Sequence, residues 1–393
     1  METNVNAAAV KAAATITRRI AGRGDVTVTA GNGQLRFTRA DAATDTTATV
    51  SVPMDGILHG AAVLADDDLR RIATVKGSIT VETVAAGFRF GTGDVTLGTT
   101  VRDADRIVAE AWQAPAMESP LAVVVEPSHD RAAEAVTIMQ GVAEAAAKGS
   151  DARAVLTAVC IGDGGAIAAT DTYRLHVAER HYVHGPDHAE ALVPAFVIRA
   201  IPAAKAERFA LAAVPANAPV QDARGGRWGM RAELRYGTRR NPVTVTVTAE
   251  GPTVEGPYPR WRQLLPDAAT DATWHPVIGT YVVADGMNDA VKAVQPSGPT
   301  RVRWQDDDSV TFTAMDTVPG TVNLHAPEGA PSATLGTATT GDGDVIMNAA
   351  YLRSASAFTG DGSTVELRSP TRAVAIMGTD RMALVMPMRG GAA

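Results

Sequence analysis

Apolar residues recur along this chain at two spacings, one typical of helices and one typical of strands. The helical spacing, often rich in alanine, predicts helices over residues 7–21, 65–76, 128–148, 195–205, 285–294 and 348–358. Ser128 and the glycines that follow several of these stretches are typical helix caps. Pro202 lies inside one stretch and should end or kink that helix, because proline has no backbone N–H.

Between the helices, alternation of apolar and polar residues predicts antiparallel strands. The clearest hairpin joins residues 25–30 to 34–39 through Gly-Asn-Gly, because Asn-Gly suits a tight hairpin turn. Further strands are predicted at residues 46–53, 78–84, 87–92, 94–99, 121–126, 153–161, 166–169, 175–180, 209–214, 227–234, 243–250, 280–284, 300–304, 310–315, 321–326, 364–369, 373–378 and 382–386.

The order of helices and strands repeats three times along the chain. Each round spans about 130 residues and contains two helices and many short strands. A polar stretch with prolines, 103–117, separates the first round from the second. This order predicts three similar α+β domains, 1–119, 120–266 and 267–393, each with helices on one face of antiparallel sheets.

Composition and charge narrow the class of protein. The 46% hydrophobic content is enough to form cores, and a single cysteine, Cys160, is typical of a reducing compartment. No apolar run reaches the roughly 18 residues of a membrane span, and residues 1–6 do not start like a signal peptide. The sequence therefore predicts a soluble, intracellular protein. Its net charge of −7 argues against a uniformly basic nucleic-acid binder but allows one basic face.

Much of the positive charge lies on or just after the predicted helices, whereas strands and loops carry much of the acid. Such helices could form a surface that binds phosphates without reading sequence. Ordinary solvated helix surface is the alternative, and Glu134, Glu144 and Glu207 weaken the pattern. The basic residues are Lys11, Arg18, Arg19, Arg23, Arg70, Arg71, Lys76, Arg131, Lys148, Arg199, Lys205, Lys292 and Arg353.

Two clusters could suggest an enzyme or a metal site. The histidines are His176, His181, His184 and His188, but their spacing matches no standard ligand set. The run of three aspartates at 306–308 falls where a hairpin turn is predicted, so a solvated turn is the simpler interpretation. No catalytic constellation is found, and we expect neither enzymatic activity nor a cofactor.

The spacing of apolar residues does not account for three short segments, here called the motif segments. They are residues 169–175 (Ala-Thr-Asp-Thr-Tyr-Arg-Leu), 258–266 (Tyr-Pro-Arg-Trp-Arg-Gln-Leu-Leu-Pro) and 386–389 (Met-Pro-Met-Arg). In the first, Thr-Asp-Thr offers short side-chain oxygens that bond nearby backbone and bend a strand. By pattern alone, a bulged strand accounts for it.

Together, the motif segments resemble those of the bacterial sliding clamps, the beta subunits of DNA polymerase III. That family has Ala-Thr-Asp-Gly-Tyr/His-Arg-Leu, Phe/Tyr-Pro-x-Tyr-Arg-x-Leu-Ile/Leu-Pro and Met-Pro-Met-Arg-Leu, in this order. Here Thr172 replaces the glycine and Gly390 replaces the final leucine. The first 119 residues match in the order of elements more than in letters, as in a divergent member.

The resemblance implies a homodimeric, head-to-tail ring of α+β clamp domains whose helices line a hole for double-stranded DNA. It implies partners as well: the replicative DNA polymerase, the clamp loader and repair proteins that carry a clamp-binding peptide. Such a protein is cytoplasmic, associated with the nucleoid, and confers processivity without catalysis.

The resemblance also implies a peptide groove to which all three motif segments contribute. Thr172 and Gln263 depart from the family pattern, since a glycine and a basic residue are usual there. The implied groove residues are Arg153, Leu156, Thr170, Thr172, Tyr173, Arg174, Leu175, Pro259, Gln263, Leu264, Asn348, Tyr351, Val385, Met386, Pro387 and Met388. The alternative is a β-rich structural or assembly protein, possibly viral, which predicts open or larger assemblies and no peptide groove.

Overall fold

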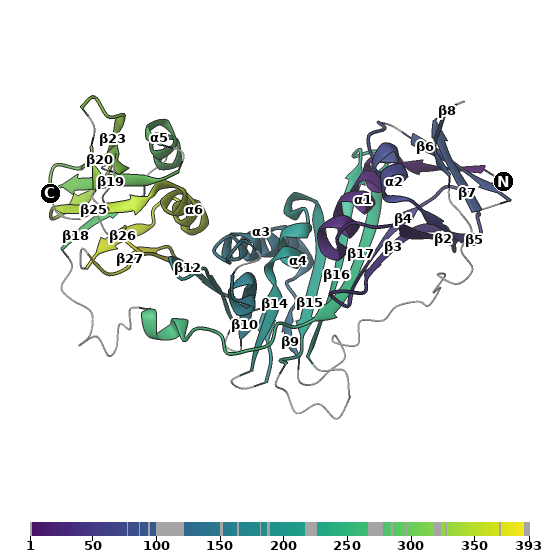
Figure 1. Cartoon of the computed structure of the whole chain (residues 1–393), viewed down its shortest axis with the longest axis horizontal. Coiled ribbons are helices and arrows are strands. Elements are labelled where there is room, and N and C mark those ends of the chain that lie inside the picture. Colours follow the sequence, from purple (N-terminus) through teal and green to yellow (C-terminus); the bar gives the residue numbers. More distant parts are fainter. Residues whose placement is uncertain are drawn as a thin grey trace. The chain divides into compact units, whose positions relative to one another are not determined.

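The structure is a computed structural model, drawn in Figure 1. It describes residues 2–76, 78–85, 87–92, 95–99, 122–149, 152–162, 165–180, 182–186, 189–216, 226–265, 278–283, 286–295, 297–317, 324–326, 328–368 and 371–388. Packing divides the chain into two units. Unit 1 comprises Met1–Gln140, Cys160–Gly165 and His181–Gly256, and unit 2 comprises Gly141–Val159, Ala166–Arg180 and Pro257–Ala393.

Unit 1 is built on a nine-stranded sheet in the order β13-β9-β15-β16-β17-β4-β3-β2-β5. A second sheet has the order β1-β6-β7-β8. The helices are α1 (Ala7–Ala21), α2 (Asp66–Ile72) and α4 (Ala195–Ala200). The strands are β1 (Glu2–Asn6), β2 (Val26–Gly31), β3 (Gln34–Asp41), β4 (Thr46–Pro53), β5 (Gly60–Leu64), β6 (Ser78–Val84), β7 (Gly87–Thr92), β8 (Val95–Thr99), β9 (Val123–Val125), β13 (Val183–His184), β14 (Glu190–Pro194), β15 (Ala206–Ala213), β16 (Arg227–Gly237) and β17 (Pro242–Pro252).

Helix α1 shows how local sequence fixes one element of unit 1. The Asn6 side chain accepts a hydrogen bond from Ala9 N–H at 3.2 Å and so caps the helix start, and Gly22, at φ 67°, ends it. The helix packs its buried alanines and isoleucines against β3 and β4 (Figure 1). Buried and partly buried residues alternate along β4, as expected for a strand with one covered face.

A buried arginine ties α1, α2 and the sheet of unit 1 together. Arg39, on β3, donates to the carbonyl oxygens of Gly22 and Gly24 and forms a 2.6 Å ion pair with Asp66 at the start of α2. Burial opposes ionisation of Asp66, but hydrogen bonds and charge from Arg39, and then from Arg70, hold its pKa below the ordinary value.

Unit 2 contains a run of hydrogen-bonded strands in the order β11-β12-β28-β27-β26-β18-β24, a sheet β23-β20-β19-β25 and a small β21-β22 pair. Helix α6 packs on β28 and against α5 (Figure 1). Both α3 (Ala132–Ala143) and β10 (Ala158–Gly162) contribute residues to both units. The other elements are β11 (Ala166–Thr170), β12 (Arg174–Glu179), β18 (Gly279–Val282), α5 (Met287–Val294), β19 (Pro299–Gln305), β20 (Ser309–Ala314), β21 (Asp316–Thr317), β22 (Leu324–His325), β23 (Ser332–Gly336), β24 (Thr339–Thr340), β25 (Gly343–Asn348), α6 (Ala349–Thr359), β26 (Thr364–Leu367), β27 (Val374–Met377) and β28 (Arg381–Val385).

All six predicted helices form, and three end earlier than predicted. Helix α2 ends at Ile72, four residues before the predicted end. Helix α3 ends at Ala143, because the amides of Ala145 and Ala146 turn to the carbonyl three residues back. Helix α4 ends at Ala200, ahead of Pro202. None of the helices in the described residues combines the length and apolar content of a membrane span.

The strand predictions hold for most of the described sheets, with one replacement and several omissions. The start of the predicted strand 153–161 is instead a 3-10 turn, Ala154–Thr157. The strands that were not predicted are β1, β5, β13, β14, β21, β23, β24 and β25. The polar stretch 103–117 lies outside the described residues, as do both predicted domain boundaries, so the three-domain division stays a prediction.

Candidate functional site

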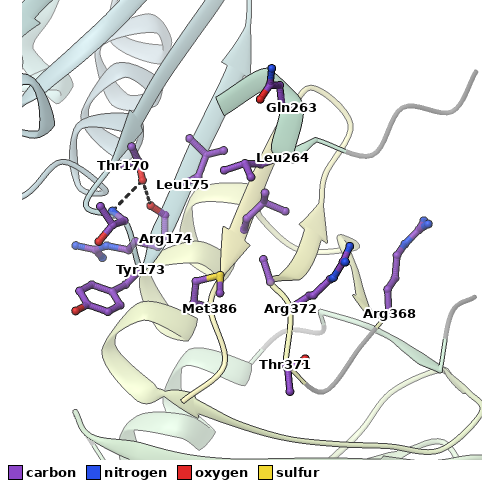
Figure 2. A pocket seen from close by; sticks show the side chains of 13 residues that line it. Thr170, Tyr173, Arg174, Leu175, Gln263, Leu264, Arg368, Thr371, Arg372 and Met386 are labelled. Carbon is purple, nitrogen blue, oxygen red and sulfur yellow. Dashed lines mark hydrogen bonds between the residues drawn. The ribbon is translucent and has the colours of Figure 1, made fainter. Parts of the chain in front are cut away.

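A pocket of about 520 Å³ lies within unit 2. Its walls come from the β11–β12 turn, the 3-10 helix Trp261–Leu264, the segment between β26 and β27, and the end of β28. Figure 2 shows these side chains. The lining residues are Thr170, Thr172, Tyr173, Arg174, Leu175, Gln263, Leu264, Arg368, Thr371, Arg372, Ala373, Leu384 and Met386. Parts of all three motif segments therefore meet around one cavity.

The β11–β12 turn is held by its own side-chain oxygens. The Thr170 hydroxyl donates to the Arg174 carbonyl at 2.7 Å and accepts from Thr172 N–H at 3.1 Å. Asp171 Oδ1 accepts from the backbone N–H groups of Tyr173 and Arg174, each at 3.0 Å. Thr172 has φ 78°, in the left-handed region where a β-branched residue is rare. Thr170 and Asp171 thus fix a turn that Thr172 fits only with backbone strain.

Arg174 faces the body of unit 2 and is already paired. Its Nε lies 3.0 Å from Asp171 Oδ2, and its Nη1 donates to Ser354 Oγ at 2.9 Å. The guanidinium also lies over the Tyr351 ring, 4.6 Å from the centroid. Burial, with the nearby charge of Asp171, raises the pKa of the Tyr351 phenol. These contacts fasten the turn to α6, so the Arg174 charge is compensated before any ligand arrives.

Strand pairing brings the end of β28 beside this turn. Arg174 pairs with Val385, and Leu175 with Leu384, in the β12–β28 ladder. The Met386 amide then donates to the Tyr173 carbonyl at 2.8 Å. Because side chains alternate along a strand, Val385 is fully buried while Met386 faces the pocket (Figure 2).

The second motif segment is anchored by an aromatic pair. Trp261 is buried with Leu175 and Leu384 in the core beneath the pocket, and Tyr258 packs against the same cluster. The Thr170 amide donates to the Tyr258 hydroxyl at 3.1 Å, which joins this segment to the β11–β12 turn. With Trp261 fixed, the short 3-10 helix presents Leu264 to the pocket.

The pocket has a buried apolar floor and an exposed apolar rim. Leu175 and Leu384 form the floor and are almost fully buried. Tyr173, Leu264 and Met386 form the rim and are 62%, 55% and 39% exposed. Large apolar side chains gathered around a cavity are typical of a surface that another molecule covers, and methionine adapts easily to different occupants.

The other implied groove residues lie outside the lining of the pocket. Asn348 caps α6, since its side chain accepts from the amides of Ala350 and Tyr351. Arg153 is exposed and Leu156 is buried beside β10. Those that lie outside the lining are Arg153, Leu156, Pro259, Asn348, Tyr351, Val385, Pro387 and Met388.

The sequence analysis did not assign six residues to the site: Asp171 and the lining residues Arg368, Thr371, Arg372, Ala373 and Leu384. Asp171 lies inside a motif segment, and the pattern of an Asx turn could have identified it as the group that holds the turn. Arg368, Thr371 and Arg372 come from the segment between β26 and β27. Nothing in that segment's own sequence signals a site, because only sheet pairing brings it to the pocket.

The basic residues proposed for DNA lie on helices or next to them in both units. Helix α1 carries Lys11, Arg18 and Arg19 and no acidic residue. In contrast, the arginines of α2 form ion pairs with aspartates of the same helix: Arg70 pairs with Asp66 and Asp67, and Arg71 pairs with Asp68. Lys148 pairs with Glu144 at 2.7 Å. Exposed positions are Lys11, Arg19, Arg23, Arg70, Arg71, Lys76, Arg131, Lys148, Lys205 and Lys292, whereas Arg18, Arg199 and Arg353 are partly buried.

The described residues hold no group of side chains suited to a metal ion. His176 is buried, and burial lowers its pKa to about 4; His184 is exposed. His181 and His188 lie outside the described residues. Residues 306–308 form the turn between β19 and β20, which confirms the prediction of a turn there.

No protein-family model and no curated protein matches this sequence. Solved structures do match it. The beta clamp of Helicobacter pylori bound to a DNA ligase peptide is 14% identical, with a TM-score of 0.70 over 99% of this chain and 100% of that one. DNA polymerase III beta from Thermotoga maritima is 15% identical (TM-score 0.68, 99% of both chains), and that from Pseudomonas aeruginosa is 15% identical (TM-score 0.65, 99% and 100%). The chain therefore has the beta-clamp fold, an α+β fold, over nearly its whole length.

Proposed function

We propose that this protein is a divergent bacterial DNA sliding clamp. It forms a homodimeric, head-to-tail ring of three clamp domains per chain, 1–119, 120–266 and 267–393, and it encircles double-stranded DNA. It acts as a non-catalytic processivity factor in the cytoplasm, at the nucleoid. Two observations together support this best. The clamp fold extends over nearly the whole chain, and the motif segments, which resemble those of the sliding clamps, meet at one pocket.

The pocket in unit 2 is the proposed binding site for partner peptides. Its apolar floor and adaptable rim suit a short segment with leucine and aromatic side chains. The H. pylori beta clamp was solved with a DNA ligase peptide bound, so a protein of this fold does bind a partner's peptide. Here the partners are the replicative polymerase, the clamp loader and repair proteins.

The basic helices are the proposed DNA-facing surface. Helix α1 supports this most clearly, because Lys11, Arg18 and Arg19 have no acidic residue on the same helix. Contacts of this kind reach phosphates without reading bases, so the ring can slide. The net charge of −7 then reflects the rest of the molecule, which DNA does not touch.

The ring hypothesis is tested by light scattering and by DNA topology. A closed dimer has twice the 40.7 kDa of one chain, whereas a structural assembly protein gives larger or open species. After loading, the protein should stay on nicked circular DNA and be lost from the same DNA once it is cut to a linear form. Equal retention on both forms would contradict encirclement.

The peptide hypothesis is tested by changing the rim. Met386→Glu should abolish binding of an acetylated, amidated Gln-Leu-Ala-Leu-Phe peptide in calorimetry and leave the dimer intact. Ile278→Glu is the matched control, because Ile278 is also in unit 2, is 45% exposed and lies outside the pocket. Unchanged affinity in Met386→Glu would refute the site.

A further inference from the structure

The charged side chains in the described lining of the pocket are all positive. Three arginines, Arg174, Arg368 and Arg372, are among the residues that surround the cavity, and no aspartate or glutamate is among the described residues of the lining. In Figure 2, Arg368 and Arg372 lie on the right of the pocket and Arg174 on the left, with Met386 between. What the pocket attracts therefore depends on which of these charges is already compensated.

Two of the three arginines are paired with acids of their own unit. Arg174 forms the 3.0 Å ion pair with Asp171 described above. Arg368 places Nε and Nη2 at 2.9 and 2.7 Å from Glu366 Oε2, and both side chains are mostly buried. These arginines shape the wall but add little net charge to it.

Arg372 differs from both. Its side chain is exposed, and among the described residues it makes neither an ion pair nor a hydrogen bond. Arg372 therefore supplies the lining's one uncompensated charge within the described part of the chain. It lies beside Ala373 and near the apolar rim, so a peptide whose leucines fill the cavity passes within its reach.

We propose that Arg372 makes this pocket selective for partner peptides that carry an aspartate or glutamate next to their apolar anchor residues. This inference rests on the proposed function, since it assumes that the pocket takes peptides. A carboxylate there gains a charge-assisted contact with a guanidinium that has no competing acid in the described part of the chain. The buried apolar floor beside it excludes water from one side and strengthens the contact.

The attraction of an acidic peptide to this pocket is a local effect, because the whole protein is negatively charged. The chain carries a net −7, so the general field of the molecule repels an acidic peptide. Any gain in affinity from a peptide carboxylate must therefore come from a nearby positive group. A solvent-exposed pair of this kind is expected to give about a two- to five-fold gain in affinity.

The test compares acetylated, amidated peptides, which have no terminal charges. The probes are Gln-Leu-Ala-Leu-Phe, the same peptide with Glu in place of Ala, and the same peptide with Glu added after Phe. At least one Glu peptide should bind wild type about two- to five-fold more tightly than the neutral peptide. Arg372→Gln should remove this gain, measured as the ratio of the Glu-peptide affinity to the neutral-peptide affinity of the same variant. Arg303→Gln, an exposed arginine outside the pocket, should keep the gain.

Charge reversal gives a second readout. Arg372→Glu should turn the preference towards the peptides with Lys in place of Glu. Equal affinity of neutral and Glu peptides for wild type, or a gain that survives Arg372→Gln, would overturn the inference while leaving the peptide site standing. Failure of every peptide to bind wild type would overturn the proposed site, and the inference with it.

Discussion

Replacing Thr172 by glycine should stabilise the protein, although it removes a side chain from the candidate site. Thr172 has φ 78° in the turn between β11 and β12. In that region the Cβ atom of an L-residue crowds its own backbone, and a β-branched side chain is the least tolerant. Glycine has no Cβ and adopts this conformation freely.

The expected gain follows from three contributions. Relief of the left-handed strain contributes about 1–2 kcal/mol. The turn's hydrogen bonds are retained, because Thr172 takes part only through its backbone N–H, and its exposed side chain loses little packing. Glycine's greater freedom in the unfolded chain costs about 0.4–1 kcal/mol. The net increase in the free energy of unfolding is therefore about 0.5–1 kcal/mol.

Urea unfolding of wild type, Thr172→Gly and Thr172→Ala measures this effect. Alanine keeps a Cβ but loses the branch, so its stability should lie between the other two. The midpoint should rise from wild type to alanine to glycine with an unchanged slope. A glycine variant that is less stable than wild type, or an alanine variant that exceeds it, would refute the strain argument.

Three further predictions concern the free energy of unfolding, at His176, Arg39 and Asn348. Burial lowers the pKa of His176 from 6.5 to about 4. The free energy of unfolding should therefore keep its full contribution from neutral His176 above pH 6.5 and lose about 3 kcal/mol as the pH falls to 4. His176→Phe should lack this loss, and parallel pH profiles of unfolding for the two proteins would contradict the prediction. Arg39→Met should cost about 3–5 kcal/mol in unfolding, because it leaves Asp66 without its buried partner, whereas Arg71→Met at an exposed pair should cost less than about 1 kcal/mol. Asn348→Ala should cost about 1 kcal/mol through loss of the helix cap, and Asn348→Asp should restore it; a loss of peptide affinity without a loss of stability would argue for direct contact.

Local signals explain which parts of the fold could be predicted. The helix at residues 7–21 was found to the residue, because Asn6 and Gly22 mark its two ends. The end of α3 at Ala143 could not be found, since alanine continues beyond it and the chain leaves the helix through tertiary contacts: the Ala147 amide donates to the Leu156 carbonyl. Strand β1 was missed because its alternation, Glu2–Asn6, is short and polar.

The candidate site also has parts that could be predicted from the sequence and parts that could not. Its motif segments could be found by resemblance, and the structure brings Leu175, Leu264 and Met386 to one cavity. The wall containing Arg368 and Arg372 could not be found, because its position depends on the pairing of β26, β27 and β28, which no local pattern encodes. The resemblance also assigned Arg174 to the groove; the structure places it in the pocket lining and pairs it with Asp171.

The motif segments combine two tasks, which are carried by different residues. Asp171, Arg174 and Trp261 point inward and hold the backbone, the first two through their mutual ion pair and the third in the core. Their neighbours Tyr173 and Leu264 point out and form the rim. Because the inward residues set where the outward ones lie, a substitution at Asp171 should disturb the pocket without touching its contents. In each motif segment, the inward residues therefore fix the shape of the site, whereas substitutions at the outward residues can change which partner binds.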